Sequence, residues 1–177
     1  ILDRAMKSGG YVTDGVKPSI SPSMDIQVSS NFERALFDAY GRDGAAVAAL
    51  MAELKAGGFT ISQGALQMLR DTFASGRCGE EEMLETIRRA FAETGEVLCP
   101  HSAVGVKVAE ENLGAAPMIT LATAHPAKFP DAVERAMGAR PGLPPRMADL
   151  FDRPERVTRV ANDLAALQSI VRERTGR

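Results

Sequence analysis

The 177-residue chain contains no tryptophan, only two histidines and only two cysteines. Cys78 and Cys99 match neither a CxxC motif nor a disulfide framework, which is typical of a protein in a reducing compartment. Two histidines and two cysteines at these spacings fit no metal-ligand template. No hydrophobic run approaches membrane-spanning length, and no signal-peptide pattern is found. The sequence predicts a cytoplasmic protein with no metal site and no membrane contact.

The chain also lacks a strong charge of either sign. It carries 21 basic and 23 acidic side chains, with a formal net charge of −2. Hydrophobic residues make up 45% and charged residues 25%, which is close to the globular average. The arginines near the C-terminus are interspersed with acids, and this pattern favours a solvated helix face. We therefore expect an ordinary folded domain with no nucleic-acid partner.

The first residues, ILDRAMKSGG, have the pattern of the end of a helix. Leu2 and Met6 are four residues apart, and a glycine pair is a common helix stop. The sequence has no initiator methionine, and this helix has no start signal. We expect the chain to be the C-terminal part of a longer protein.

Residues 30–93 carry helical periodicity and almost no strand signal. Pro18 and Pro22 favour extended structure just before this stretch, and Ser30 or Asn31 is a suitable N-cap. Short helical faces then follow at the spacing of three and four residues: Phe32, Ala35, Leu36 and Ala39; Val47, Leu50, Met51 and Leu54; Leu66, Leu69 and Phe73; Met83, Ile87, Ala90 and Phe91. We expect a linker over residues 1–29 and a helical subdomain over residues 30–95.

From residue 96 the pattern changes to alternating strands and helices. EVLC predicts a short strand before a turn at Cys99-Pro100 and a helix that runs to Gly114. PMITLAT is the strongest strand of the chain, and a helix from about Pro126 to Met137 follows it. A further helix carries an apolar stripe of Leu164, Leu167 and Val171. Strand–helix alternation predicts an α/β fold with a parallel sheet, here over residues 96–177.

The candidate site residues follow the two predicted strands. Ligands bind beyond the carboxyl ends of the strands in open α/β sheets. Thr123 ends PMITLAT, His125 follows it, and His101 begins the helix after the first strand. Simpler roles remain open: Thr123 merely ends a strand, His125 caps a helix, and His101 bonds backbone at its own turn. No serine nucleophile motif and no Gly-rich phosphate loop occurs.

Three segments resemble one enzyme family. SPSMDIQVSSNFERALFD, CPHSAVG and LATAHPAKFPDAV occur in this order and resemble the signatures of threonine synthases of the longer bacterial and fungal branch. The resemblance runs from Ile1 to about Met137, and residues 138–177 carry no matching motif. It implies the C-terminal part of a type II pyridoxal-phosphate (PLP) enzyme fold with a mainly helical insertion. It also implies conversion of O-phospho-L-homoserine and water to L-threonine and phosphate.

The resemblance also implies roles for individual residues. The hydroxyl of Thr123 is expected against the pyridine nitrogen of PLP, and His101 and Ser102 are expected to line the cofactor ring. The Schiff-base lysine belongs to the N-terminal part of the same protein, so this chain holds no catalytic residue and Lys128 is not the anchor. The family usually has an acid at the position of Cys99, where cysteine is a poor helix cap.

The segment SSNFER is the candidate substrate contact. Asn31 and Arg34 are three residues apart on one side of a helix. Arg34 is expected to bind the substrate phosphate as a bidentate donor, with an ion pair to Asp38 as the alternative. Two rival functions stay open, namely another type II PLP-dependent lyase and a non-enzymatic helical interaction module.

Overall fold

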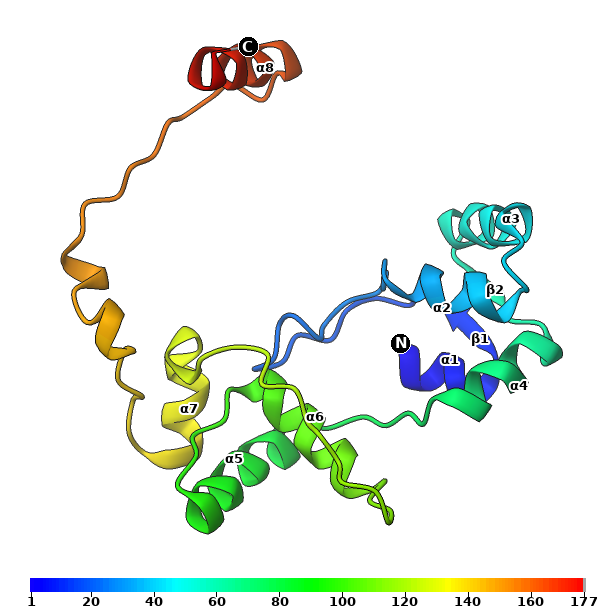
Figure 1. Cartoon of the computed structure of the whole chain (residues 1–177), viewed down its shortest axis with the longest axis horizontal. Coiled ribbons are helices and arrows are strands. Elements are labelled where there is room, and N and C mark those ends of the chain that lie inside the picture. Colours follow the sequence, from blue (N-terminus) through cyan, green and yellow to red (C-terminus); the bar gives the residue numbers. More distant parts are fainter. Residues whose placement is uncertain (177) are drawn as a thin grey trace. The chain divides into compact units, whose positions relative to one another are not determined.

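The computed structural model describes residues 1–176, so that Arg177, the last residue of the predicted α/β portion, lies outside it. The chain divides into a first compact unit, Ile1–Gly142, and a second unit that begins at Leu143. Figure 1 shows the order of the helices along the chain. The first unit contains two hydrophobic clusters, and it holds every candidate site residue.

The first cluster is built by the N-terminal elements and the early helices. These are α1 (Leu2–Ser8), β1 (Gly10–Val12), α2 (Phe32–Ala39), α3 (Gly44–Lys55), β2 (Gly58–Thr60) and α4 (Gln63–Thr72). Leu36 on α2 is fully buried there. The Tyr11 ring stacks between those of Phe32 and Phe59, with centroids 5.8 and 5.0 Å away. Aromatic stacking therefore fastens β1 to both α2 and β2.

β1 and β2, which the sequence patterns do not predict, form an antiparallel pair. Tyr11 lies opposite Phe59, and Val12 lies opposite Gly58. A Cβ atom on Gly58 would lie 2.5 Å from the carbonyl oxygen of Tyr11. The close approach of the two backbones therefore requires glycine at this position. Each strand has only three residues, which explains why no periodicity announces it.

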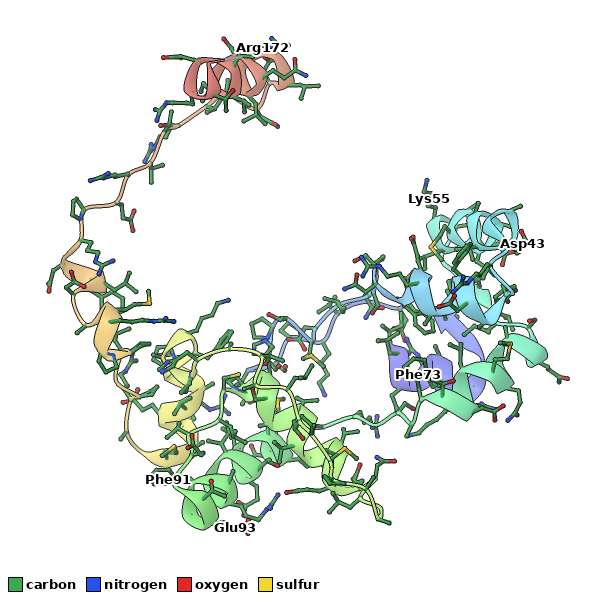
Figure 2. The ribbon with its side chains drawn as sticks, in the orientation of Figure 1. Asp43, Lys55, Phe73, Phe91, Glu93 and Arg172 are labelled. Carbon is green, nitrogen blue, oxygen red and sulfur yellow. The ribbon has the colours of Figure 1, made fainter. Side chains whose placement is uncertain are left out.

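Local sequence signals set the helix ends in this cluster. The expected stop of the first helix is confirmed, because α1 ends at Gly9 in the left-handed conformation with φ of 80°. The Asp43 carboxylate accepts hydrogen bonds from the backbone of Ala45 and Ala46 and so caps α3, which runs to Lys55 (Figure 2). Asn31 is the N-cap residue of α2, but its side chain makes no capping bond.

The second cluster is built by α5 (Glu80–Thr94), α6 (Pro100–Glu110) and α7 (Pro130–Met137). α5 packs against both α6 and α7. Leu84, Ile87, Ala103 and Ala136 form the buried contact between these helices. Three glutamates open α5, and they suit the positive end of its dipole. α5 thus packs with the helices that follow it in the chain, whereas α2 and α4 pack with each other in the first cluster.

Two predicted strands do not form in the described part of the chain. Residues 96–99 and 117–123 have no strand pairing, although their composition favours strands. Ile119 is 83% exposed and Leu121 is 76% exposed. A strand needs a hydrogen-bonding neighbour, and none of the described residues pairs with either segment. The expectation of strands at these positions is therefore wrong for this chain by itself.

The helix expected from about Pro126 begins later than predicted. Pro126–Lys128 form a single 3₁₀ turn, η1, and the α-helix starts at Pro130. Phe129 between them has φ of −130° and ψ of 57°, which is not helical. Proline disfavours helical geometry in the residue before it, so Pro130 forces this break.

The second unit contains two 3₁₀ turns, η2 (Pro145–Met147) and η3 (Leu150–Asp152), and the helix α8 (Leu164–Thr175). The predicted stripe of Leu164, Leu167 and Val171 lies on α8, and all three residues are exposed. Asp163 caps this helix, since its carboxylate accepts a hydrogen bond from the backbone of Ala166 at 2.7 Å. Within residues 1–176, no helix is long and apolar enough to cross a membrane.

Candidate functional site

The candidate site is built on the first turn of α6. Pro100 is the first helical residue, where its missing N–H costs nothing. The Sγ atom of Cys99 accepts a hydrogen bond from the backbone N–H of Ser102 at 3.4 Å. The thiol thus takes the place of an oxygen acceptor, and the expectation that cysteine caps this helix poorly stays a prediction about the strength of the cap. The side chain of Ser102 lies beside Thr123, the last residue of PMITLAT.

Ser102 and Thr123 form a hydroxyl pair. The backbone N–H of Thr123 donates to the Oγ of Ser102 at 3.1 Å, and the two hydroxyl oxygens lie 3.3 Å apart. The Sγ of Cys99 is 3.2 Å from the Ser102 oxygen and 3.8 Å from the Thr123 oxygen. Ser102 is 3% exposed, whereas Thr123 is exposed. When Ser102 donates to Thr123, the proton of the Thr123 hydroxyl is free to bind an outside acceptor.

The same contacts change the pKa of the Cys99 thiol. Burial raises its pKa, while the hydrogen bonds from Ser102 and Thr123 lower it, and the net pKa lies below the ordinary value of a thiol. Cys99 is only 1% exposed, so the sulfur is not accessible to reagents in solution. The Cys99 sulfur therefore serves as a buried hydrogen-bond acceptor beside Ser102 and Thr123.

The side chain of His101 is buried, and its hydrogen bond goes to a residue outside this pair. It is 7% exposed, and its Nε2 accepts a hydrogen bond from the backbone N–H of Ser23 at 3.0 Å. Its ring lies 4.4 Å from that of Phe129, and its Nδ1 is buried without a hydrogen-bond partner. Burial and the charge of Lys128 lower the pKa of His101, and Asp25 raises it by a smaller amount. The imidazole is therefore neutral at pH 7.

His125 and Lys128 have local roles. The Nδ1 of His125 accepts a hydrogen bond from the backbone of Ala127 at 3.2 Å, which confirms the expected alternative of a helix cap. Lys128 is exposed, and its Nζ lies 5.8 Å from the centroid of the Phe129 ring. This cation–π contact occupies the ammonium group at the protein surface.

The substrate candidates lie in the first cluster. Asn31 and Arg34 are both exposed, at the start of α2. The expected alternative, an ion pair between Arg34 and Asp38, does not form, because the Asp38 carboxylate binds Arg42 at 3.1 Å. None of the hydrogen bonds found in residues 1–176 joins Asn31 or Arg34 to the hydroxyl pair. The structure therefore brings Cys99, Ser102 and Thr123 together and leaves the substrate candidates on another element.

Sequence reasoning did not predict that a loop at the start of the motif SPSMDIQVSSNFERALFD contacts His101. Residues 19–25 lie beside the start of α5 and border a cavity of about 500 Å³. Ser21 is fully buried there, and its hydroxyl has no partner. The prolines announce a turn in this loop, but no sequence signal shows that a backbone N–H will bind a histidine some 80 residues later.

Comparison with known proteins identifies relatives of this chain by sequence and by structure. A family model described as threonine synthase, C-terminal, matches residues 102–171. A threonine synthase of Pseudomonas aeruginosa is 46% identical over the whole chain, and the chain covers 39% of that relative. The crystal structure of PLP-bound threonine synthase from Brucella melitensis matches 97% of the chain with a TM-score of 0.88 and 52% identity. The yeast threonine synthase structure matches 99% with a TM-score of 0.80 and 31% identity.

The chain is shorter than these relatives. It covers 38% of the Brucella chain and 40% of the yeast chain. It thus spans about two fifths of the length of the relatives it matches.

Proposed function

Since the chain belongs to the threonine synthase family and matches its C-terminal part, we propose that it forms the C-terminal part of an enzyme that converts O-phospho-L-homoserine and water to L-threonine and phosphate. The Brucella relative binds PLP, and the same cofactor is proposed for this protein. The observation that carries the proposal is the hydroxyl pair of Ser102 and Thr123 at the start of α6.

The hydroxyl pair fits the pyridine nitrogen of PLP. A ring nitrogen is a hydrogen-bond acceptor, and the exposed Thr123 hydroxyl can donate to it when the Thr123 oxygen accepts from Ser102. A neutral hydroxyl leaves the ring nitrogen largely unprotonated, whereas a carboxylate would hold it protonated. When bound, PLP supplies an electron sink whose strength depends on the charge at this nitrogen. Thr123 therefore moderates the sink, and Ser102 orients Thr123.

The remaining chemistry belongs to other parts of the enzyme. Lys128 is at the surface with its ammonium over Phe129, so it is not proposed as the Schiff-base lysine. That lysine and the loop for the cofactor phosphate are assigned to the N-terminal part of the same protein. The exposed apolar residues Ile119 and Leu121 are proposed to contact that part, with PMITLAT as a strand of the completed sheet.

Arg34 and Asn31 are proposed to bind the substrate phosphate. In the described part of the chain Arg34 makes no ion pair, because the nearby Asp38 is taken by Arg42. A guanidinium with free donors is suited to bidentate binding of phosphate. Its place at the start of α2 adds the positive end of a helix dipole, and the Asn31 amide supplies a further donor.

The proposed location is the cytoplasm. Cys78 and Cys99 are both free thiols in the structure. Free cysteines in a folded protein suit a reducing compartment.

The proposal is tested with the complete enzyme and with residues 1–177 alone. The complete enzyme should release phosphate from O-phosphohomoserine and form threonine in equal amounts, while residues 1–177 alone should do neither. Turnover by this chain alone would show that the catalytic groups are misplaced. A complete enzyme that ignores phosphohomoserine but acts on another amino acid would favour a different PLP-dependent lyase.

Arg34 has a control in Arg42, which lies just beyond the other end of α2. Arg34→Ala should raise the KM for phosphohomoserine about tenfold to a hundredfold, because a hydrogen bond to a charged group contributes about 1.5–3 kcal/mol. Arg42→Ala removes an arginine that is 77% exposed and paired with Asp38, and it should leave KM unchanged. Equal effects of the two variants would remove Arg34 from the substrate site.

A further inference from the structure

The loop of residues 19–25 is closed by its own hydrogen bonds. The Asp25 carboxylate accepts from the backbone N–H of Ser19 at 2.6 Å and from the Ser19 hydroxyl at 2.9 Å. The Ser19 oxygen in turn accepts from the backbone of Ser21 at 3.0 Å, and the backbone of Met24 donates to the Ser21 carbonyl at 2.9 Å. The loop is therefore held in its shape by hydrogen bonds between its own residues.

Two hydrogen bonds tie this loop to the second cluster. The backbone N–H of Ile20 donates to the carboxylate of Glu80 at the start of α5, at 3.2 Å. The backbone N–H of Ser23 donates to the Nε2 of His101 on α6, at 3.0 Å. His101 is the direct neighbour of Ser102, and α2 with Asn31 begins a few residues beyond the loop. The His101 bond therefore links the turn that carries Ser102 to the segment that leads along the chain into α2.

The bond from Ser23 fixes the form of the imidazole. An Nε2 that accepts a hydrogen bond carries no proton, so a neutral His101 has its proton on Nδ1. The Phe129 ring packs against the imidazole at a tilt of 47°, with the ring centroids 4.4 Å apart. The charged groups that act on it are Lys128, which disfavours protonation, and Asp25, which favours it. Protonation of Nε2 would turn the acceptor into a second donor facing Ser23, and the bond would be lost.

We propose that His101 is a positioning residue, which in its neutral form holds the loop of residues 19–25, and with it the start of α2, against the turn that carries Ser102. This role rests on the proposed function, because it aligns the proposed phosphate contacts with the proposed cofactor contact. His101 itself touches neither ligand in this role. Its place in the reaction is to set the distance between the two halves of the site.

The first experiment tests the hydrogen bond between Ser23 and His101 directly, without an activity assay. Amide hydrogen exchange of the peptide spanning residues 20–26 is followed in the complete enzyme. His101→Phe keeps a ring against Phe129 but has no acceptor, so exchange should become at least about tenfold faster there. His101→Gln offers an oxygen at the place of Nε2 and should keep most of the protection. Unchanged exchange in His101→Phe overturns the proposal.

The second experiment measures kinetics against pH. The pKa of His101 lies below its ordinary 6.5, so the tie is complete above pH 6.5 and is lost as the pH falls through that lower pKa. Wild-type kcat/KM should fall over this acid range, and the KM for phosphohomoserine should rise while the cofactor absorbance stays unchanged. His101→Gln cannot titrate and should lose this acid limb while keeping activity at pH 8 within about threefold.

A matched control and two outcomes complete the test. His125→Asn alters the other histidine of the chain but keeps a capping side chain for Ala127, and it should keep the acid limb. If His101→Gln also keeps the acid limb, His101 does not position the loop. If wild type releases no phosphate from phosphohomoserine, the proposed function is wrong, and the exchange of residues 20–26 still decides the role of His101.

Discussion

Removing the side-chain hydroxyl of Thr123 tests the link between the structure and the proposed reaction. Thr123→Val keeps the β-branched shape and replaces the hydroxyl with a methyl group. The Ser102 oxygen, which is buried, would still accept from the backbone N–H of residue 123 and could donate to the Cys99 sulfur at 3.2 Å. Among residues 1–176, the substitution therefore adds no buried polar group without a partner to those already present. The free energy of unfolding should therefore fall by less than about 1 kcal/mol.

The effect on the reaction should be much larger than the effect on stability. Without the hydroxyl, the ring nitrogen of the cofactor loses its donor in a partly desolvated site, at a cost of about 1–3 kcal/mol. If this loss falls on the transition state, kcat/KM drops about tenfold to a hundredfold. Thr123→Ser should recover much of the activity, because it restores the donor. Thr123→Asp should shift the absorbance of the bound cofactor by holding its nitrogen protonated.

The assay is phosphate release by the complete enzyme, with cofactor absorbance and urea unfolding recorded for each variant. Thr120→Val is the matched control, because Thr120 lies in the same segment and makes no side-chain hydrogen bond among the described residues. It should keep kcat/KM within about threefold. A Thr123→Val enzyme with unchanged cofactor absorbance and unchanged kcat/KM would refute the assignment of Thr123 to the cofactor.

The remaining predictions concern the surroundings of the site and the core. Cys99→Ala removes the acceptor for the Ser102 N–H and should lower the free energy of unfolding by about 1 kcal/mol, which Cys99→Ser should restore; equal unfolding curves would show that the thiol does not cap α6. Lys128→Ala should leave the cofactor absorbance intact, and loss of that absorbance in a folded protein would make Lys128 the anchor. Ile87→Ala empties a fully buried position and should cost about 2–5 kcal/mol in urea unfolding, whereas a cost under 1 kcal/mol would place Ile87 outside the core.

Sequence patterns predicted the helices well because their signals are local. Asp43 and Gly9 act within one turn of their own helix, and such signals are readable from neighbouring residues alone. The segment PMITLAT shows where this reading stops. Its composition favours a strand, but a strand is completed only by a partner, and no described residue supplies one. The short pair β1–β2 was missed for the opposite reason, since distant residues create it without any local pattern.

The candidate site was predictable in part. Motif resemblance pointed to Ser102 and Thr123, and the structure brings their hydroxyls within 3.3 Å of each other. Their proposed cofactor role stays a prediction. The function of Cys99 could not be read from sequence, because its sulfur acts through distances to two hydroxyls and not through its residue type. The bond between Ser23 and His101 was equally hidden, since a backbone N–H looks the same at every position.

The pairing of β1 with β2 has a consequence for how this gene can change length. The chain leaves at Val12 and returns at Gly58, which lie opposite each other. The two ends of residues 13–57 are therefore held together whatever lies between them, and an insertion adds only a little closure entropy. We therefore expect an insertion at the exposed turn between α2 and α3, at Gly41 and Arg42, to leave α1 and α4 in place. A length change between Ser19 and Asp25, by contrast, would break the loop that reaches α5 and α6.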